Sequence, residues 1–223
     1  KFAERNILFS RAIGAESKLI LHRDPKQRVQ RVAPWLTTDT NTYPAVVDGR
    51  IVWIVDAYTT LDAYPYAQRS SLQGPVTSAS GVTRLGKQVA YVRNSVKATV
   101  DAYDGTVTLY QIDRDDPVLQ AWMGAFPGVV QPEDTVSDEL RAHFRYPEDL
   151  FKIQREMLAR YHVDEPREFF TTNAFWSVPS DPTTDANVAQ PPFYVLVGDE
   201  QSAQPSFRLA SAMVGYNREF LSA

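Results

Sequence analysis

The 223-residue sequence contains no cysteine. This absence excludes disulfide bonds, thiolate zinc sites, iron–sulfur clusters and cysteine nucleophiles together. Only three histidines are present, His22, His143 and His162, and no G-x-S-x-G motif accompanies them, so a serine triad is not favoured. The glycine-rich phosphate motifs G-x-x-x-x-G-K-[ST] and G-x-G-x-x-G are also missing. The sequence therefore predicts no catalytic residue and no cofactor.

Candidate metal ligands are equally sparse. Glu139 and His143 stand one helical turn apart, a spacing from which both side chains can reach one metal ion. Neither an H-E-x-x-H motif nor a second histidine pair completes such a site, so this spacing favours an ordinary surface pair. We therefore expect no metal site.

Long apolar runs and a large excess of one charge are absent as well. The longest apolar runs, 51–55 and 194–197, are far shorter than the roughly 20 residues of a membrane-spanning helix. The 23 basic and 27 acidic residues give a formal net charge of -4, which argues against a broad basic surface for nucleic acid or anionic lipid. With 43% hydrophobic and 22% charged residues, the composition is typical of a folded, soluble domain with no nucleic acid partner.

The first 36 residues are expected to form a helical lead-in, 1–36. Apolar residues in 2–9 can share one helix face. A clearer helix begins at Asp24-Pro25, where aspartate can accept amide hydrogen bonds as the N-cap and proline suits the first helical position. Pro34 then ends it.

A hairpin region follows at 43–113. Asp48-Gly49 and Asp104-Gly105 each separate two strand-like runs, and this dipeptide is typical of a two-residue type I′ turn, because both turn residues need positive φ. The apolar strand 51–55 is expected to be central and covered on both faces. The second turn predicts the cross-strand pairs Ala102 with Val107, Val100 with Leu109, and Asp101 with Thr108.

The region 116–164 is predicted to be helical. One helix begins at Asp116-Pro117, and a second, running through Phe144, begins at a capping-box pattern that starts at Thr135. The clearest helix opens at Pro147 and is predicted to place its apolar residues on one side. These residues are Leu150, Ile153, Met157 and Tyr161.

Two further segments lack this helical pattern. The segment 70–87 is rich in Ser, Gly, Thr and Gln and is expected to be a surface loop. C-terminal strands are predicted in 193–223, at 193–197 and 206–214. No partner for the last strand follows it in this sequence, so self-association through that strand is a possible interaction.

The densest mixture of aromatic, acidic and hydroxyl side chains lies in the hairpin region. Asp-Ala-Tyr occurs three times, at 56–58, 62–64 and 101–103. An internal repeat would explain this, but so would the ordinary use of Asp at the end of a strand and of Tyr at a half-buried position, which such a short match favours. The candidate binding residues are Trp53, Asp56, Tyr58, Thr59, Asp62, Tyr64, Tyr66, Asp101 and Tyr103. Such a mixture suits a glycan or a polar lipid headgroup, but the residue types favour a buried strand followed by a structured proline loop, because Tyr and Trp are commonly core residues with a bonded polar tip.

Three long stretches resemble one known family. They are 43–60 with Tyr64-Pro65-Tyr66, 93–108, and 140–151. Together they are similar to a large, uncharacterised bacterial membrane-protein family, found notably in actinobacteria, in which several N-terminal transmembrane helices precede a large domain outside the membrane. The resemblance implies that this chain is the first part of that soluble extracytoplasmic domain. The start at Lys1 without methionine and the apolar end at 220–223 also favour a piece of a larger chain.

We therefore expect an α+β fold with a mainly antiparallel sheet that is packed by helices. The sheet is expected to be built around the Asp-Gly hairpins and the C-terminal strands. Residues 1–223 are expected to be part of one soluble extracytoplasmic domain. The leading function is a non-enzymatic binding or assembly module of a multi-pass membrane protein in the cell envelope. Its expected partners are the rest of its own polypeptide, including the transmembrane region, and an envelope lipid or glycan. The alternative is an envelope hydrolase that uses acidic residues near Asp56 and Asp101, which requires these carboxylates to converge within about 5–10 Å.

Overall fold

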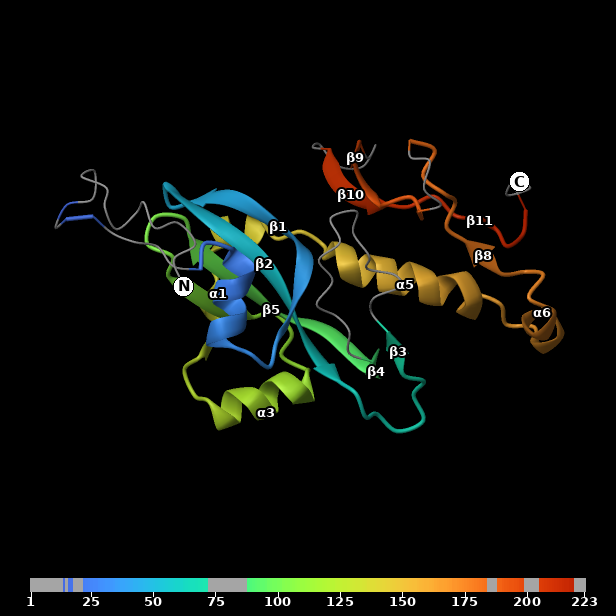
Figure 1. Cartoon of the computed structure of the whole chain (residues 1–223), viewed down its shortest axis with the longest axis horizontal. Helices are drawn as coiled ribbons and strands as arrows, with labels where there is room; N and C mark the ends of the chain where they lie inside the picture. The colour runs from blue at the N-terminus through green and yellow to red at the C-terminus, as the bar shows by residue number, and fades with distance from the viewer. Residues whose placement is uncertain are drawn as a thin grey trace.

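The computed structural model describes Gly14, Glu16, Ser17 and residues 22–71, 88–183, 188–198 and 205–218. In this part of the chain, the central element is a five-stranded sheet with strand order β1-β2-β5-β6-β7 (Figure 1). Its strands are β1 (Thr37–Val47), β2 (Arg50–Leu61), β5 (Tyr91–Asp101), β6 (Val107–Gln111) and β7 (Val130–Gln131). Neighbouring strands are antiparallel except β6 and β7, which run parallel. Together with the helices packed against this sheet, this arrangement confirms the predicted α+β class.

The first Asp-Gly hairpin forms as predicted. Val47 pairs with Arg50, which leaves only Asp48 and Gly49 in the turn. Both turn residues have positive φ, 50° and 71°, as a type I′ turn requires. The strand that leaves this turn, β2, lies between β1 and β5 and is buried from Ile54 to Thr59, so its predicted central place is confirmed.

The second hairpin differs from the prediction. Val100 pairs with Val107 and not with Leu109, and β5 ends at Asp101. Among residues 102–105 only Gly105 has positive φ, so the turn is not the two-residue type I′ form. The physical reason is local, because the Asp101 carboxylate accepts hydrogen bonds from the N–H groups of Tyr103 and Asp104, at 2.7 and 3.1 Å. These bonds stabilise a longer turn, which the Gly105 N–H closes by donating to the Asp101 carbonyl.

One face of the sheet carries the larger hydrophobic core. Helix α1 (Pro25–Val32) and helix α3 (Pro117–Ala125) supply Val29 and Leu119, which are both fully buried. The sheet and the connecting segments supply Ala33, Leu36, Val55, Ala57, Val96, Ala98, Val100, Leu109 and Val130. Trp35 stacks on Trp122 of α3 with ring centroids 5.0 Å apart, which extends this core to its edge.

The opposite face has a smaller core and a polar region beside it. Tyr43, Ala45 and Ile54 pack there with Val136 and with Leu140 of helix α4 (Asp138–Ala142). Since side chains alternate along a strand, the residue two positions after Ile54, Asp56, lies on this same face. The sheet therefore places a buried carboxylate directly beside an apolar core.

The helix starts follow the predicted capping chemistry at two of three places. Asp24 and Asp116 each cap their helix by accepting a hydrogen bond from the N–H two residues later. The capping box predicted at Thr135 is wrong: its hydroxyl donates to the Pro132 carbonyl at 2.6 Å, within the short 3₁₀ helix η2 (Glu133–Thr135). Ser137 caps α4 instead, and α4 ends at Ala142, before the predicted end at Phe144.

Helix α5 (Glu148–Tyr161) begins where it was predicted but buries the other side. Its buried residues are Asp149, Lys152, Arg155 and Ala159. Of the four apolar residues predicted to share one side, Leu150 and Ile153 are half-buried, whereas Met157 and Tyr161 are 56% and 64% exposed. The reason is that the sheet and the C-terminal segment present hydrogen-bonding groups to α5, so the polar side chains find their partners inside.

The C-terminal segment lies beside α5 and not in the central sheet (Figure 1). It follows helix α6 (Pro166–Thr171) and contains β8 (Trp176–Ser177), β9 (Phe193–Val197), β10 (Ser206–Ala210) and β11 (Val214–Gly215). Strand β10 pairs with β9, and β11 pairs with β8. In the described residues these strands do not join the five-stranded sheet, so that part of the prediction is wrong.

The single strand predicted at 206–214 is also interrupted. Ser211 lies between β10 and β11, and its hydroxyl accepts a hydrogen bond from Arg155 of α5 at 2.9 Å. This contact holds residue 211 against α5, and the chain resumes extended pairing only at Val214.

Some predictions fall on residues outside the described ranges. These are the helix over 2–9, residues 72–87 of the predicted loop, and the terminal segment 220–223. The flanks of the loop form β3 (Ser70–Ser71) and β4 (Gln88–Val89), which pair with each other. None of the helices found in the described ranges combines the length and the apolar character needed to cross a bilayer.

Candidate functional site

The nine candidate binding residues do not share one surface. Asp56, Tyr58 and Thr59 are buried in β2, each less than 4% exposed. Beyond the end of that strand Asp62, Tyr64 and Tyr66 are exposed, with Tyr64 stacked on Tyr91 at 5.7 Å between ring centroids. At the opposite end of the sheet Asp101 ends β5 and Tyr103 lies in the second hairpin turn. Trp53 is partly buried against the larger core.

Asp56 forms a buried ion pair with Lys97, its cross-strand neighbour on β5. The Lys97 ammonium also donates to the Arg145 carbonyl at 2.9 Å, and Asn94 donates to the Asp56 carboxylate at 3.3 Å. Burial raises the pKa of Asp56, although Lys97 opposes that shift. A carboxylate held in this way serves as a structural partner of Lys97.

Tyr58 and Thr59 each bond to a different buried aspartate. The Tyr58 hydroxyl donates to Asp39 of β1, and burial raises its pKa well above 10. The Thr59 hydroxyl donates to Asp116, which also accepts from Ser95. Since Asp116 is the N-cap of α3, these bonds fasten the start of that helix to the sheet.

Asp101 is a turn residue with a cationic partner. Arg50 pairs with it at 2.7 Å, and this bond together with the backbone N–H groups lowers the pKa of Asp101 to about 2. Arg50 also lies over the Tyr103 ring, 5.1 Å from its centroid. Asp101 pairs with Val52, four residues before Asp56 on β2, so the backbones of the two aspartates are about 13 Å apart along the strand direction at roughly 3.3 Å per residue. Each carboxylate is held there by its own cationic partner, so the two do not converge as a pair of hydrolytic carboxylates must.

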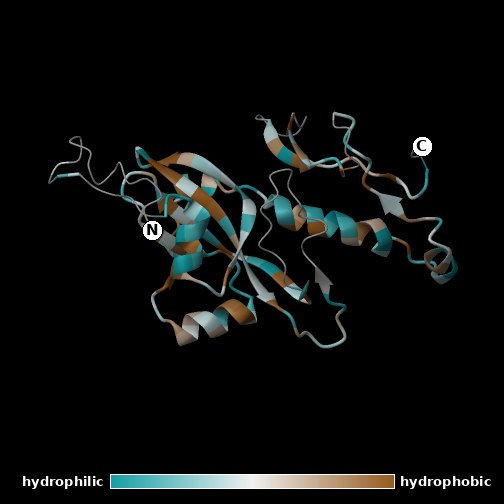
Figure 2. Ribbon diagram, in the orientation of Figure 1, coloured by the Kyte–Doolittle hydropathy of each residue, from teal (hydrophilic) through white to brown (hydrophobic). Residues whose placement is uncertain are grey.

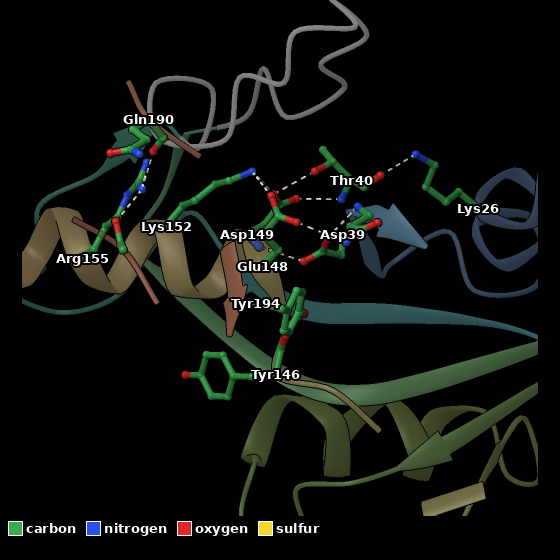
Figure 3. Close-up of polar contacts among 12 residues, drawn as sticks. Lys26, Asp39, Thr40, Tyr146, Glu148, Asp149, Lys152, Arg155, Gln190 and Tyr194 are labelled. Atoms are coloured by element: carbon green, nitrogen blue, oxygen red, sulfur yellow. Dashed lines mark hydrogen bonds and ion pairs between the residues drawn. The ribbon is translucent and has the colours of Figure 1, made fainter. Parts of the chain in front are cut away.

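A second polar network joins β1 to the first turn of α5 (Figure 3). Asp149 accepts hydrogen bonds from the N–H and the hydroxyl of Thr40, at 2.7 and 2.8 Å. Asp39 accepts from the Asp149 N–H at 3.1 Å and from the Asn41 N–H at 2.7 Å. Both aspartates are 1% exposed. Sequence reasoning missed both, because the two partners lie 110 positions apart.

These two carboxylates influence each other. Burial and the nearby charge of Asp149 raise the pKa of Asp39 to about 7. Burial raises the pKa of Asp149 as well, while the bonds from Thr40 oppose the shift. Lys152 lies 3.5 Å from Asp149 and 2.7 Å from Glu148, and it supplies a positive charge at the edge of the cluster. The network is suited to hold α5 against the sheet and to respond to pH.

Arg155 continues the buried side of α5 toward the C-terminal segment. Its guanidinium donates to the Gln190 carbonyl and the Ser211 hydroxyl, both at 2.9 Å (Figure 3). Its Nε is buried with no hydrogen-bond partner among the described residues. Burial lowers the pKa of Arg155. Arg155 therefore links Gln190 and Ser211 of the C-terminal segment to α5.

A pocket of about 420 Å³, open to solvent, lies between β5 and the start of α5. Its polar lining consists of Arg93, Asn94, Lys97, Asp113, Arg145 and Gln154. The Arg145 guanidinium lies over the rings of Tyr43 and Tyr194, 4.5 and 5.8 Å from their centroids.

The sequence contained one indication of this pocket, which is the pair of cationic residues in the apolar strand β5. A buried lysine in a central strand requires a partner, and its neighbour across the sheet, Asp56, was itself a candidate residue. Arg145 offered no such indication, because its position depends on how residues 143–147 connect α4 to α5.

Metal-binding geometry is not found in the described ranges, where no group of three or more His, Asp or Glu residues could hold an ion. His143 is the C-cap residue of α4 and Glu139 is exposed on the same helix. His162 stacks on Trp176 at 3.8 Å between ring centroids. The described histidines of this region therefore have structural contacts.

Comparison with known proteins finds close relatives of unknown activity. Residues 1–223 match UPF0182, an uncharacterised protein family. The chain is 81% identical over 223 residues to UPF0182 protein Mb0065 of Mycobacterium bovis and 80% identical to UPF0182 protein Rv0064 of Mycobacterium tuberculosis. It is 70% identical over 227 residues to UPF0182 protein RHA1_ro06389 of Rhodococcus jostii. The whole chain is covered in each case, but it spans only 23% of each relative. No solved structure matches the chain.

Proposed function

The chain belongs to the uncharacterised family UPF0182, and from that premise we propose that it is a non-enzymatic assembly module of a larger, multi-pass membrane protein of the bacterial cell envelope. Its partner in this proposal is the rest of its own polypeptide. An extracytoplasmic location is part of the proposal and is supported by the resemblance of its longest sequence stretches to a family with N-terminal membrane helices.

The observation that carries the proposal is the orientation of α5. This helix buries its polar residues and leaves an apolar face, Met157, Leu158 and Tyr161, more than half exposed. A surface helix of a complete globular domain normally does the reverse. Figure 2 shows apolar and polar residues alternating along α5. Such a face is expected where another part of a protein packs.

The ribbon formed by β9 and β10 adds to this apolar surface. Its exposed large side chains are Phe193, Tyr194, Leu196 and Phe207. Within the described ranges neither strand pairs with a third strand, and an isolated two-stranded ribbon is only marginally stable. Its unpaired strand edges and its exposed aromatic residues both favour packing of a further polypeptide segment against the ribbon.

The length of the relatives indicates which part of the protein covers the apolar face of α5 and the β9–β10 ribbon in our proposal. Because the chain spans 23% of the curated proteins it matches, more than three times its own length lies elsewhere in those polypeptides. A segment of the same polypeptide is always present at high effective concentration, which favours it over a second copy. We therefore assign the α5 face and the β9–β10 ribbon to contacts within the same protein.

The arrangement of the acidic residues supports a role without catalysis. Asp56 is neutralised by Lys97, and Asp101 caps a turn and pairs with Arg50. Neither carboxylate lines the 420 Å³ pocket. A hydrolase that uses this pair would instead require both groups to converge in one cleft.

The proposal is tested by producing this 223-residue chain and the remainder of its protein as two polypeptides in one cell and measuring their co-purification. We expect the two to co-purify, and we expect M157K/Y161K to reduce the recovered partner about tenfold or more. Placing two charges in a buried apolar contact is costly. V46K, which adds a lysine at another exposed apolar position, is the matched control and should leave recovery unchanged.

The double variant should melt close to the parent when the chain is alone, since both side chains are more than half exposed and Tyr161 loses only a ring contact with Phe169. Recovery unchanged by M157K/Y161K, or failure of the two parental polypeptides to co-purify, would contradict the proposal. A concentration-dependent dimer of the isolated chain that is abolished by M157K/Y161K would show that a second copy, and not the same polypeptide, occupies the face.

A further inference from the structure

The pocket between β5 and α5 is lined by three cationic side chains from two distant parts of the sequence. Arg93 and Lys97 come from β5, and Arg145 comes from the segment between α4 and α5. Two carboxylates oppose them, because Arg93 pairs with Asp113 at 2.7 Å and Lys97 pairs with the buried Asp56. The balance is one positive charge at the pocket, although the whole chain carries a formal charge of -4.

Arg145 supplies that charge in an orientation suited to a ligand. In the described part of the chain no carboxylate pairs with it, and its guanidinium lies over Tyr43 and Tyr194. A cation–π contact uses no N–H group of the guanidinium, and among the described residues no hydrogen bond involves the side-chain N–H groups of Arg145, so these groups remain for an acceptor. Tyr43 is itself fixed, because its hydroxyl accepts from the Arg145 backbone N–H at 3.1 Å.

Lys97 and Asn94 provide further polar groups on the same wall. An ammonium has three N–H donors, and the described contacts use two of them, to Asp56 and to the Arg145 carbonyl. Asn94 uses its NH₂ group toward Asp56 and the Ala57 carbonyl, so its side-chain oxygen remains as an acceptor on the pocket wall. Leu150 and Pro147 line the pocket as well and can contact an apolar part of a ligand.

From this arrangement we propose that the pocket binds a small organic phosphate, with the phosphate group at Arg145, Arg93 and Lys97. Its volume of about 420 Å³ falls within the range of small-molecule sites and exceeds what one inorganic phosphate fills. Cations from separate elements suit the oxygens of a phosphate, which point in several directions, whereas the two coplanar oxygens of a carboxylate are satisfied by one guanidinium. The phosphate can belong to a lipid headgroup or to a soluble phosphate ester.

This inference goes beyond the assembly role and does not depend on it, because the exposed residues Met157 and Tyr161 do not line the pocket. A failure of phosphate binding therefore leaves the co-purification experiment unaffected. The reverse holds as well, since M157K/Y161K should bind phosphate like the parent chain.

The test measures binding of inorganic phosphate and of acetate to the 223-residue chain at low ionic strength, where screening of the charges is weak. We expect phosphate to bind more tightly than acetate. R145Q should lower the phosphate affinity about tenfold or more, because it removes a charged bidentate donor. The control R141Q makes the same charge change at an exposed arginine that pairs with Glu133 outside the pocket, and it should leave binding within about twofold of the parent.

A second variant is expected to change the phosphate affinity in the opposite direction. D113N removes the carboxylate that pairs with Arg93 and should tighten phosphate binding several-fold, since Arg93 is then released toward the ligand. D138N makes the same charge change at an exposed position in α4 and should not tighten binding. Melting temperatures of all four variants confirm that each is folded.

Vesicles with and without an anionic phospholipid distinguish the two sources. Vesicle binding that depends on the anionic lipid, is weakened by R145Q and is competed by phosphate supports a headgroup. Phosphate binding without vesicle binding supports a soluble ester. Absence of both, equal effects of R145Q and R141Q, or acetate binding as tight as phosphate binding would overturn the proposal.

Discussion

Asp149, in the first turn of α5, accepts two hydrogen bonds from Thr40 on β1, one from the backbone N–H and one from the hydroxyl. The two residues lie 109 positions apart in the sequence, and Asp149 is 1% exposed. This contact attaches the N-terminus of α5 to an outer strand of the sheet, and the favourable position of a carboxylate at a helix N-terminus adds to it. It also explains why α5 buries its polar side.

D149A should therefore lower the free energy of unfolding by about 2–4 kcal/mol, because it removes two charge-assisted hydrogen bonds and leaves the partly buried N–H and hydroxyl of Thr40 without this acceptor. The control D138A removes an acidic residue from the first turn of α4 at an exposed position and should cost less than about 1 kcal/mol. Urea unfolding of both variants measures the difference. Equal costs would show that the helix dipole, and not the bonds to Thr40, accounts for the effect.

The raised pKa of Asp39 predicts a pH dependence of stability. Because burial and Asp149 raise that pKa from 3.8 to about 7, the folded chain holds the proton more tightly than the unfolded chain. The stabilisation is fully present below about pH 4 and is lost as the pH rises through about 7. D39N should flatten this part of the profile. Denaturation midpoints between pH 5 and pH 8 test it, and an unchanged slope in D39N would assign the dependence to other groups.

The carboxylates with lowered pKa values act in the opposite direction and in a lower pH range. For Asp101 the pKa of about 2 means that its contribution is present above pH 4 and is lost as the pH falls toward 2. D101N should therefore change the acid side of the profile and leave the slope between pH 5 and pH 8 intact. This makes it a matched control for D39N.

The Asp56–Lys97 pair gives a further prediction. K97M leaves Asp56 buried without its cation, which should cost about 3–5 kcal/mol at neutral pH. The loss should be smaller at pH 5, where Asp56 can take up a proton more readily, since burial raises its pKa. The double variant D56N/K97M should recover most of the lost stability. A double variant as unstable as K97M would indicate that Lys97 acts mainly through the Arg145 carbonyl.

The first hairpin turn allows a test of backbone conformation alone. Gly49 has φ 71°, and a Cβ atom at this position would meet no atom within 4 Å. G49V should thus cost about 1–3 kcal/mol purely from the positive φ. G49N should cost clearly less, because asparagine enters this region more readily. Equal thermal midpoints for G49V and the parent would contradict the type I′ turn.

What the sequence alone determined was the local structure. The Asp48-Gly49 turn and the caps Asp24 and Asp116 depend on bonds between residues two to four positions apart, so residue type at fixed spacing was sufficient to predict them. Family membership was likewise predictable, because long ordered stretches carry far more information than one motif.

The tertiary structure decided the face of α5, the place of the C-terminal strands and the pocket. Helical periodicity predicted one apolar side that includes Met157 and Tyr161. The partners of Asp149 and Arg155, which decide the buried side, lie about 110 and 35–56 positions away, and periodicity contains no information about them. The same holds for Arg145, which meets Tyr43 only because the chain returns to β1 after 102 residues. The physical reason is that a buried polar group must find a donor or an acceptor, and only the folded chain determines which one is within reach.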